Sequence, residues 1–116
     1  MISKKKKEKF NRKERVRRRE DFQRVLREGR RAHSGQYSLI VVENSLDYVR
    51  LGLSIRKSIG NAVKRNYEKR LCREFFRREI IGLKRGFDVL IIIKHRTESF
   101  PESYRRLQEL FQRSLK

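Results

Sequence analysis

Apolar residues in the middle of the chain follow the pattern of two β-strands. Residues 36–42 are rich in β-branched and aromatic side chains, and from residue 49 to residue 56 apolar side chains occupy the odd positions and polar or small ones the even positions. A period of two places the odd-numbered side chains on one face of a sheet. Because residues 43–47 are typical of a turn, the pattern predicts that these two strands pair as a β-hairpin.

A third strand and three helices complete the predicted elements. The apolar run of residues 87–93 suits a strand at the centre of a sheet. Apolar residues at helical spacing predict helices at about 20–28, at about 60–80 and after residue 99, where Ser99–Glu102 has the form of a capping box. Gly29 is expected to end the first helix in a left-handed conformation. The order of elements indicates an α+β fold in which helices cover a small sheet.

The charge of the chain points to a particular kind of partner. The 116 residues suit a single domain, and 33 Lys and Arg against 14 Asp and Glu give a net charge of +19. That excess indicates a polyanion such as nucleic acid rather than a small acidic substrate. Apolar runs stay well short of the roughly 18 residues of a membrane span, and no apolar stretch of a secretory signal follows Met1, so we expect a cytoplasmic protein without a membrane partner.

Two segments hold most of the excess charge. Residues 1–31 carry 15 positive and 5 negative groups, and residues 62–86 carry 9 positive and 3 negative groups. The basic run from Lys4 to Arg19 has almost no apolar content and so cannot bury enough surface to fold alone. We interpret residues 1–16 as a basic arm that is disordered until it binds, with a solubilising tail as the alternative, and residues 17–116 as a single RNA-binding domain.

The predicted helix at 60–80 divides its side chains between two arcs. An apolar arc, which we expect to face the core, consists of Val63, Tyr67, Leu71, Cys72 and Phe75. A basic arc on the opposite side consists of Arg65, Asn66, Lys69, Arg70, Arg73 and Arg77, and the first five of these are called the basic ridge below. Like charges four residues apart destabilise a helix, so the ridge indicates a ligand that neutralises it, and guanidinium groups bind phosphate oxygens well. The alternative is a solvated surface.

Few residues have the chemistry of a catalytic or metal site. Cys72 is the only cysteine, which excludes an internal disulfide, and we expect it to be buried. His33 and His95 have no Asp, Cys or second His at ligand spacing. Glu74 is better placed for a salt bridge with Arg70 or Arg78 of the same helix than for acid–base work. We therefore expect neither catalytic side chains nor a metal site in this chain.

These residues resemble a known family. The stretch from Leu53 to Asn66 (LSIRKSIGNAVKRN), followed by Lys69-Arg70 and Arg73-Glu74, is similar to the signature of the bacterial ribonuclease P protein subunit. The likeness extends to residues 20–22 and 86–89 and covers about residues 15–115. It implies the order α-β-β-β-α-β-α, a small mixed four-stranded sheet with helices packed on it, and a left-handed βαβ crossover, which is rare among proteins.

The resemblance also implies a function and partners. In this family a catalytic RNA removes the 5′ leader of precursor tRNA with magnesium that the RNA holds, and the small basic protein binds both that RNA subunit and the leader. The chain is therefore expected to be the non-catalytic protein subunit of an RNA-based endoribonuclease. No small-molecule substrate is expected.

Site residues follow from their positions in the family pattern. The resemblance implies that the basic ridge faces the RNA subunit. The residues implied to line a cleft for the single-stranded leader are Phe22, Leu26, Ser38, Ile40, Ser54, Arg56 and Lys57. Tyr67 stands where the family usually has an arginine, and Leu26 and Ile40 stand where relatives often have aromatic residues. Phe22 is therefore expected to carry most of the base stacking.

Other functions match the residues less well. A ribosomal or other structural rRNA-binding protein would share the charge, size and fold type and is the main alternative, but it would not need an apolar cleft for a single strand. A protein-only nuclease would need clustered carboxylates or a histidine pair. A role at a membrane surface would need a broad apolar face on the basic helix.

Overall fold

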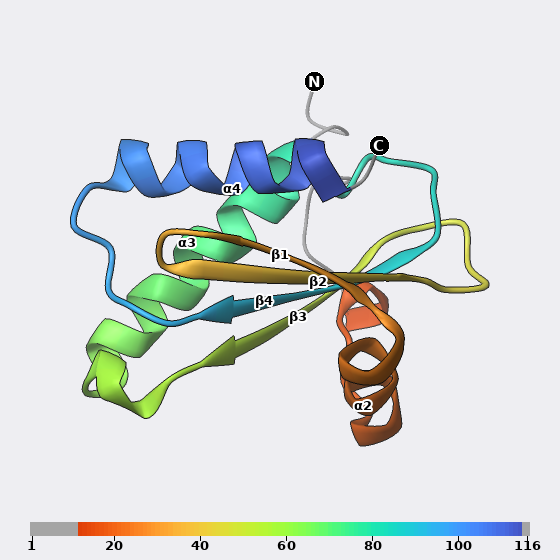
Figure 1. Cartoon of the computed structure of the whole chain (residues 1–116), viewed down its shortest axis with the longest axis horizontal. Coiled ribbons are helices and arrows are strands. Elements are labelled where there is room, and N and C mark those ends of the chain that lie inside the picture. The colour runs from red at the N-terminus through yellow and green to blue at the C-terminus, as the bar shows by residue number, and fades with distance from the viewer. Residues whose placement is uncertain (1–11, 115–116) are drawn as a thin grey trace.

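The computed structural model describes residues 12–114, and the elements run in the expected α-β-β-β-α-β-α order after a short 3-10 turn (Figure 1). The helices are η1 (Arg12–Glu14), α2 (Arg19–Glu28), η2 (Lys57–Ile59), α3 (Ala62–Glu79) and α4 (Phe100–Ser114). The strands are β1 (Arg30–Ser34), β2 (Tyr37–Glu43), β3 (Arg50–Ile55) and β4 (Phe87–Ile93). The three helices and the strand at 87–93 are thus confirmed. No helix in this part of the chain is long and apolar enough to cross a membrane.

The four strands form one mixed sheet in the order β1-β2-β4-β3. β1 pairs with β2, and β2 with β4, in antiparallel fashion, whereas β3 and β4 are parallel neighbours. α3 connects β3 to β4, which is the βαβ unit that the resemblance implies. The sheet is therefore mixed and four-stranded, as expected.

The predicted hairpin of β2 and β3 is wrong, because β4 lies between these strands. β4 is largely apolar on both faces, and such a strand is best accommodated in the interior of a sheet. The hairpin in the structure joins β1 to β2 through Gly35 and Gln36. Gly35 has a φ of 55°, and glycine at the first central position is typical of a two-residue hairpin turn.

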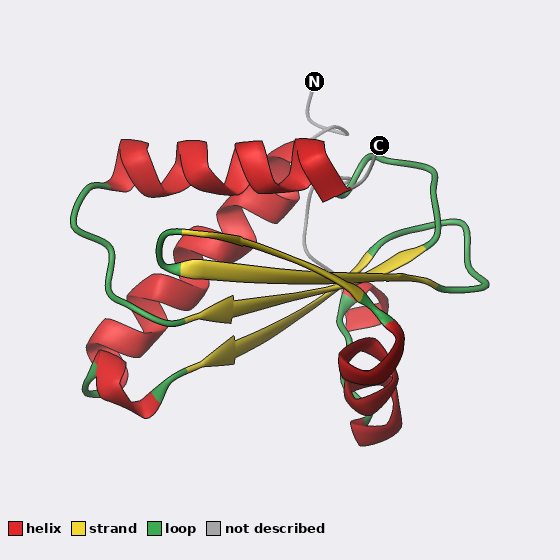
Figure 2. Ribbon diagram, in the orientation of Figure 1, coloured by secondary structure: helices red, strands yellow, loops and turns green. Residues whose placement is uncertain are grey.

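Helices cover the two faces of the sheet unequally (Figure 2). On one face, α3 and α4 pack against the larger core cluster, to which they contribute Phe75 and Leu107. On the opposite face, Val25 of α2 packs with Ile40 and Leu90 in a smaller cluster. α2 is only 10 residues long, so among the described elements no helix covers the rest of this face.

The end of α2 differs from the prediction. Gly29 is extended, with φ −77° and ψ 155°, rather than left-handed, because the chain passes directly from α2 into β1 at Arg30. Glycine is needed at this position because a side chain would not fit between α2 and β2. A Cβ at Gly29 would lie 2.5 Å from Cγ2 of Ile40 and 2.6 Å from the carbonyl oxygen of Val25.

The segment before α2 packs on the domain from residue 12 onward, although the sequence assigned residues 1–16 to the arm. Val16 is buried, and its N–H donates to the carbonyl of Leu51 at 2.9 Å. Glu14 is buried as well, and Arg15 forms an isolated parallel bridge with Leu51. Residues 12–16 therefore belong to the packed unit, because an apolar side chain fits against β3. Residues 1–11 of the predicted arm lie outside the described residues.

Candidate nucleic-acid interface

The basic ridge runs from Arg65 to Arg73 of α3 (Ala62–Glu79). Asn61 caps this helix, since its side-chain oxygen accepts a hydrogen bond from the N–H of Lys64 at 3.1 Å. Within the ridge, Asn66 and Arg70 are exposed, and the remaining three residues are half-buried along the side of the helix. The structure thus places all five ridge residues on one accessible side of α3.

The core side of α3 is rotated from the predicted arc. The apolar residues in the second half of the helix are buried as predicted, but Val63 and Tyr67 are 76% and 42% exposed. In the first half of the helix, the buried position belongs to Glu68, which is 2% exposed and accepts hydrogen bonds from the backbone N–H of Thr97 at 2.7 Å and its hydroxyl at 2.8 Å. A helical wheel that considers hydrophobicity alone assigns a glutamate to the surface. It therefore missed the buried position of Glu68, whose oxygens accept two hydrogen bonds, and placed Val63 and Tyr67 in the core instead.

Within residues 12–114, none of the four cations of the basic ridge forms an ion pair with a carboxylate. Arg77, the sixth residue of the predicted basic arc, differs, because it pairs with Glu74, which also pairs with Arg78. The predicted salt bridge between Glu74 and Arg78 is therefore confirmed, and the second partner of Glu74 is Arg77 rather than Arg70. Arg65 donates to the backbone carbonyl of Arg56 at 3.0 Å, which ties the ridge to the end of β3. The ridge keeps its full positive charge for a partner.

Arg73 marks the place where the ridge meets the N-terminal segment. Its Nε atom is buried and has no hydrogen-bond partner within the part of the chain that the structure describes. Burial lowers the pKa of Arg73, and the positive charge of Arg15 lowers it further. Both side chains line a hollow of about 240 Å³ together with Arg17, Lys69 and Phe22. The lining contains four cations and no acid, which favours a bound anion. A phosphate there would interact favourably with the charged form of Arg73 and so offset both its burial and the repulsion from Arg15.

Sequence analysis missed Arg15 and Arg17 as members of this basic surface. Arg15 was placed in the arm of residues 1–16, and Arg17, at the start of the domain, was given no role, because charge dominates that stretch. The available signal was Val16, an apolar residue between them that packs on β3 and so directs its neighbours toward the ridge.

A buried carboxylate holds α2 and the loop after β2 against the sheet. Asp88 of β4 is fully buried and accepts hydrogen bonds from Arg50 at 2.8 and 2.6 Å and from Asn44 at 2.8 Å. Arg24 of α2 lies 3.8 Å from the same carboxylate. The hydrogen bonds that Arg50 donates to Asp88 raise the pKa of Arg50. Asp88 is thus a structural residue that fixes one wall of the cleft described next.

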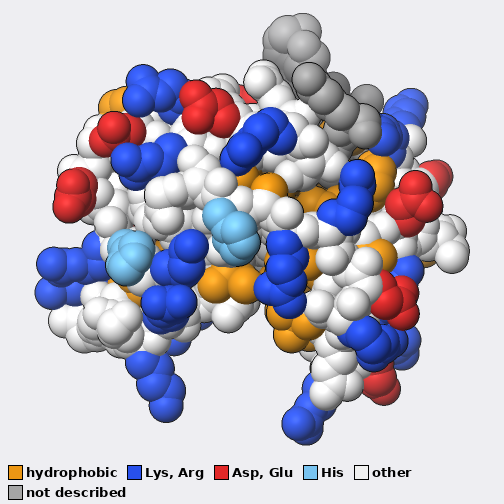
Figure 3. All heavy atoms as spheres, viewed as in Figure 1, with side chains coloured by type: hydrophobic (Ala, Val, Ile, Leu, Met, Phe, Trp, Pro, Cys, Tyr) orange, Lys and Arg blue, Asp and Glu red, His pale blue; other side chains and the backbone are white. Residues whose placement is uncertain are grey.

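The uncovered part of the sheet forms the floor of a cleft beside α2. Strand register places His33, Ser38, Ile92 and Ser54 next to one another in one row across the sheet. His33 and Ser54 are exposed, Ile92 is half-buried, and Nδ1 of His33 lies 2.6 Å from the hydroxyl oxygen of Ser38. Figure 3 shows a notch between the lobe of α2 and the lobe that carries the start of α3, with hydrophobic side chains in it and basic side chains on both lobes.

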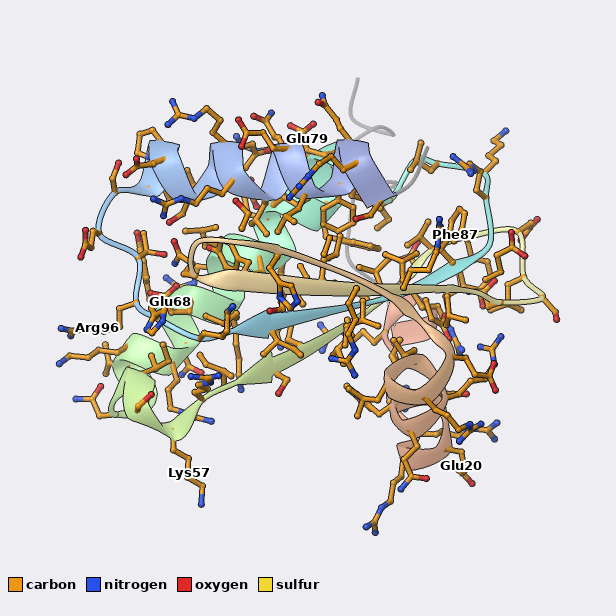
Figure 4. The ribbon with its side chains drawn as sticks, viewed as in Figure 1. Glu20, Lys57, Glu68, Glu79, Phe87 and Arg96 are labelled. Atoms are coloured by element: carbon orange, nitrogen blue, oxygen red, sulfur yellow. The ribbon has the colours of Figure 1, made fainter. Side chains whose placement is uncertain are left out.

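Several predicted cleft residues are accessible on the two sides of this notch. Leu26 on α2 is 43% exposed. On the opposite side, Ser54, Arg56 and Lys57 are exposed, and Lys57 points away from the body of the molecule (Figure 4). Phe22 is half-buried on the sheet side of α2, where a Cβ at Gly52 would approach its ring to 3.0 Å. These residues can contact a single strand laid along the cleft.

Two predicted cleft residues are not accessible. Ile40 is fully buried beneath Val25 and belongs to the core, and Ser38 is 4% exposed with its hydroxyl engaged by His33. Their accessible neighbours in the cleft are His33 and Ile92. The sequence did not indicate these two, because β1 lacks a strand-like apolar pattern and the wrong hairpin placed β3 beside β2 instead of β4.

Groups with catalytic potential lie apart from one another. Cys72 is fully buried as predicted, and burial raises the pKa of its thiol, which keeps it protonated. His33 and His95 are exposed on different segments. Within residues 12–114, no three His, Cys, Asp or Glu side chains are grouped as metal ligands would be. The interface described here is suited to binding.

Known proteins are similar to this chain in sequence. The family model described as Ribonuclease P matches residues 10–115. The chain is 44% identical over 86 residues to the ribonuclease P protein component of Syntrophus aciditrophicus, covering 74% of this chain and 72% of the relative. It is 39% identical over 85 residues to the same component from Thermotoga maritima, covering 73% of each.

Solved structures agree with these matches. The RNase P protein from Thermotoga maritima aligns with a TM-score of 0.73 at 30% identity, covering 86% of this chain and 96% of that one. A Staphylococcus aureus RNase P protein mutant, described as defective in mRNA degradation activity, aligns with a TM-score of 0.75 at 28% identity, covering 86% of each chain. The arrangement of helices and strands is therefore shared with these proteins.

Proposed function

The chain belongs to the ribonuclease P protein family, and from this membership we propose that α3 binds the RNA subunit of ribonuclease P while the cleft beside α2 receives the 5′ leader of precursor tRNA. As a protein component of ribonuclease P, the chain is part of an enzyme of tRNA 5′ processing and has an RNA partner. The cytoplasm is the expected place of this activity.

The observation that carries this proposal is the separation of two surfaces on one small domain. The basic ridge has four cations without carboxylate partners among the described residues and suits a folded, phosphate-rich RNA. The cleft has an apolar and hydroxyl-bearing floor with basic side chains on its margins, and it suits an unpaired strand whose bases face the protein. A structural rRNA-binding protein would need only the first of these surfaces.

The chemistry is assigned to the RNA subunit. Magnesium held mainly by the RNA would activate the water that hydrolyses the phosphodiester bond. The described residues hold no cluster of metal ligands, which supports a protein role in binding and positioning. With a net charge of +19, the chain would reduce the repulsion between two polyanions and so replace part of the magnesium that holds them together.

Reconstitution tests this proposal directly. Cleavage of precursor tRNA is measured across a magnesium titration with the protein alone, with a cognate catalytic RNA alone and with both together. We expect no cleavage by the protein alone and cleavage at lower magnesium when both are present. Metal-dependent cutting by RNA-free protein would contradict the assignment of chemistry, and an unchanged magnesium requirement would contradict the role of the protein.

A further inference from the structure

A hollow beside the first two turns of α3 lies outside both surfaces of the proposed function. It measures about 630 Å³ and lies between α3 and the segment that follows β4. Its lining includes Val63, Lys64 and Tyr67 from α3, and Arg96 and Glu98 from the segment after β4. Figure 4 shows Arg96 and Glu68 at this end of the molecule.

Apolar surface is concentrated in this hollow. Tyr67 and Val63 are one helical turn apart and therefore lie on the same face of α3. The large hydrophobic side chains that are exposed in the described chain are these two and Leu26, Leu46 and Phe100. Of these five, only Val63 and Tyr67 are neighbours on one face of one helix. The pair therefore forms a small apolar platform with an aromatic ring.

Cations surround this platform. Lys64 and Arg70 lie three residues before and after Tyr67, which places them on the adjoining turns of the same side of α3. Arg96 lies in the opposite wall of the hollow. Arg70 also belongs to the basic ridge, so the platform and the ridge are continuous on the surface of α3. A strand that follows the ridge reaches Tyr67 without leaving the protein.

We propose that an unpaired nucleotide of the RNA subunit stacks on Tyr67, with the phosphates on either side of it bound by Lys64, Arg70 and Arg96. The proposal rests on the proposed function, because it places the site on the RNA subunit that α3 binds. An aromatic face between cations is the combination that binds single-stranded nucleic acid, since the ring stacks on a base and the cations bind the backbone.

The carboxylates in the hollow do not oppose this assignment. Glu68 is buried and accepts two hydrogen bonds from Thr97, so it faces the protein. Glu98 is the other acid in the lining, against cations at Lys64 and Arg96. Lys64 and Arg96 thus face one accessible carboxylate, Glu98, at the surface of the hollow, and Arg70 lies beside it, so a nucleotide fits it better than an uncharged peptide segment.

The test compares three variants in binding to a cognate RNA subunit across a series of salt concentrations. Tyr67→Ala removes the ring, Tyr67→Phe keeps it, and Phe100→Ala removes a ring of nearly equal exposure (41%) on α4. We expect Tyr67→Ala to weaken binding by about 5- to 100-fold, the usual scale for one base-to-aromatic stack. Tyr67→Phe and Phe100→Ala should bind as the unaltered protein does.

The salt series separates stacking from charge. Tyr67→Ala should leave the slope of log affinity against log salt unchanged, whereas Arg70→Ala should reduce it by about 0.7 to 0.9, the value of one neutralised phosphate. Unchanged affinity of a folded Tyr67→Ala protein would overturn the stacking proposal and leave the hollow to another class of partner, such as a protein. Failure of the unaltered protein to bind the RNA subunit would instead contradict the proposed function itself.

Discussion

A missing side chain at Gly29 allows α2 to approach the sheet closely. The backbone of this residue is extended, so glycine is not required for its conformation. It is required for space, because Cγ2 of Ile40 and the carbonyl of Val25 lie where a Cβ would be. The sequence indicates that a glycine stands at the end of the helix, but the reason depends on a contact with Ile40 of β2, which local pattern does not indicate.

We expect Gly29→Ala to destabilise the protein by about 1 to 3 kcal/mol, the usual cost of overpacking a core. The measurement is the free energy of unfolding from a denaturant titration. Gly82→Ala is the matched control, because nothing lies within 4 Å of a Cβ at that position, and it should change stability little. A Gly29→Ala protein as stable as the Gly82→Ala control would show that α2 shifts freely on the sheet.

The hydrogen-bond network of Asp88 cannot be predicted from the local sequence. The run at 87–93 correctly predicts a buried strand, yet it contains a fully buried carboxylate. Its partners Arg24, Asn44 and Arg50 come from three other segments of the chain. Nothing in local pattern relates these residues, so the network that fixes one wall of the cleft is visible only in the folded structure.

At the scale of elements, local periodicity predicts well which segments are helices and strands and predicts their pairing poorly. The apolar pattern places α2, α3, β4 and α4 almost residue by residue. The order of strands in the sheet depends on contacts between segments far apart in the chain, such as Ile40 of β2 with Leu90 of β4. Because β2 and β3 are neighbours in the chain with turn residues between them, the sequence favoured a hairpin of these two strands, which the sheet does not contain.

The rotation of the core side of α3 from the predicted arc also arises from a contact between segments that are distant in the chain. Its hydrophobic arc is interrupted by Glu68, whose burial depends on donors from Thr97. The basic ridge was nevertheless predicted correctly as a surface, since four cations without acidic partners cannot be buried together at low cost. The charged side of this helix could be identified from sequence, and the exposed platform at Tyr67 could not.

The ridge itself is tested by replacing Arg65, Lys69 and Arg73 together with Ala. We expect weaker binding to the RNA subunit and a flatter salt dependence. The slope of log affinity against log salt should fall by about 0.7 to 0.9 for each phosphate that the variant no longer neutralises. Because Arg73 is half-buried, a melting curve must show that the variant folds.

The control for the ridge replaces three cations elsewhere, Lys84, Arg105 and Arg113, and so changes the net charge equally. If both triple variants show the same decrease in affinity and in slope, total charge governs binding and the ridge has no special part in it.

At the scale of the whole molecule, the unequal cover of the sheet produces the cleft. Two helices cover one face, and the short α2 closes only one end of the other. What remains is a row of strand residues flanked by Leu26 on one side and by Lys57 on the other. The resemblance implied a cleft at this place. Its actual floor, with His33 and Ile92 in it, follows from the strand order.

The cleft distinguishes this protein from a general basic RNA-binding protein, and Leu26→Glu tests it. A carboxylate at this exposed position would repel a leader phosphate and remove an apolar contact, so the holoenzyme should bind precursor tRNA more weakly. Mature tRNA has no leader, and its binding should change little. Shortening the leader to one or two nucleotides should remove the effect, because the cleft would then be empty. The measurement is the ratio of precursor to mature tRNA affinity at fixed salt.

Leu46→Glu is the matched control for this experiment. Leu46 is 40% exposed, close to the 43% of Leu26, but it lies on the loop after β2. The two variants carry the same change in net charge, so any general loss of RNA affinity should be equal in both. Only Leu26→Glu should lower the ratio of precursor to mature tRNA affinity, because only that side chain borders the cleft. Equal ratios in the two variants would remove α2 from the leader site, since the added charge would then act on RNA as a whole.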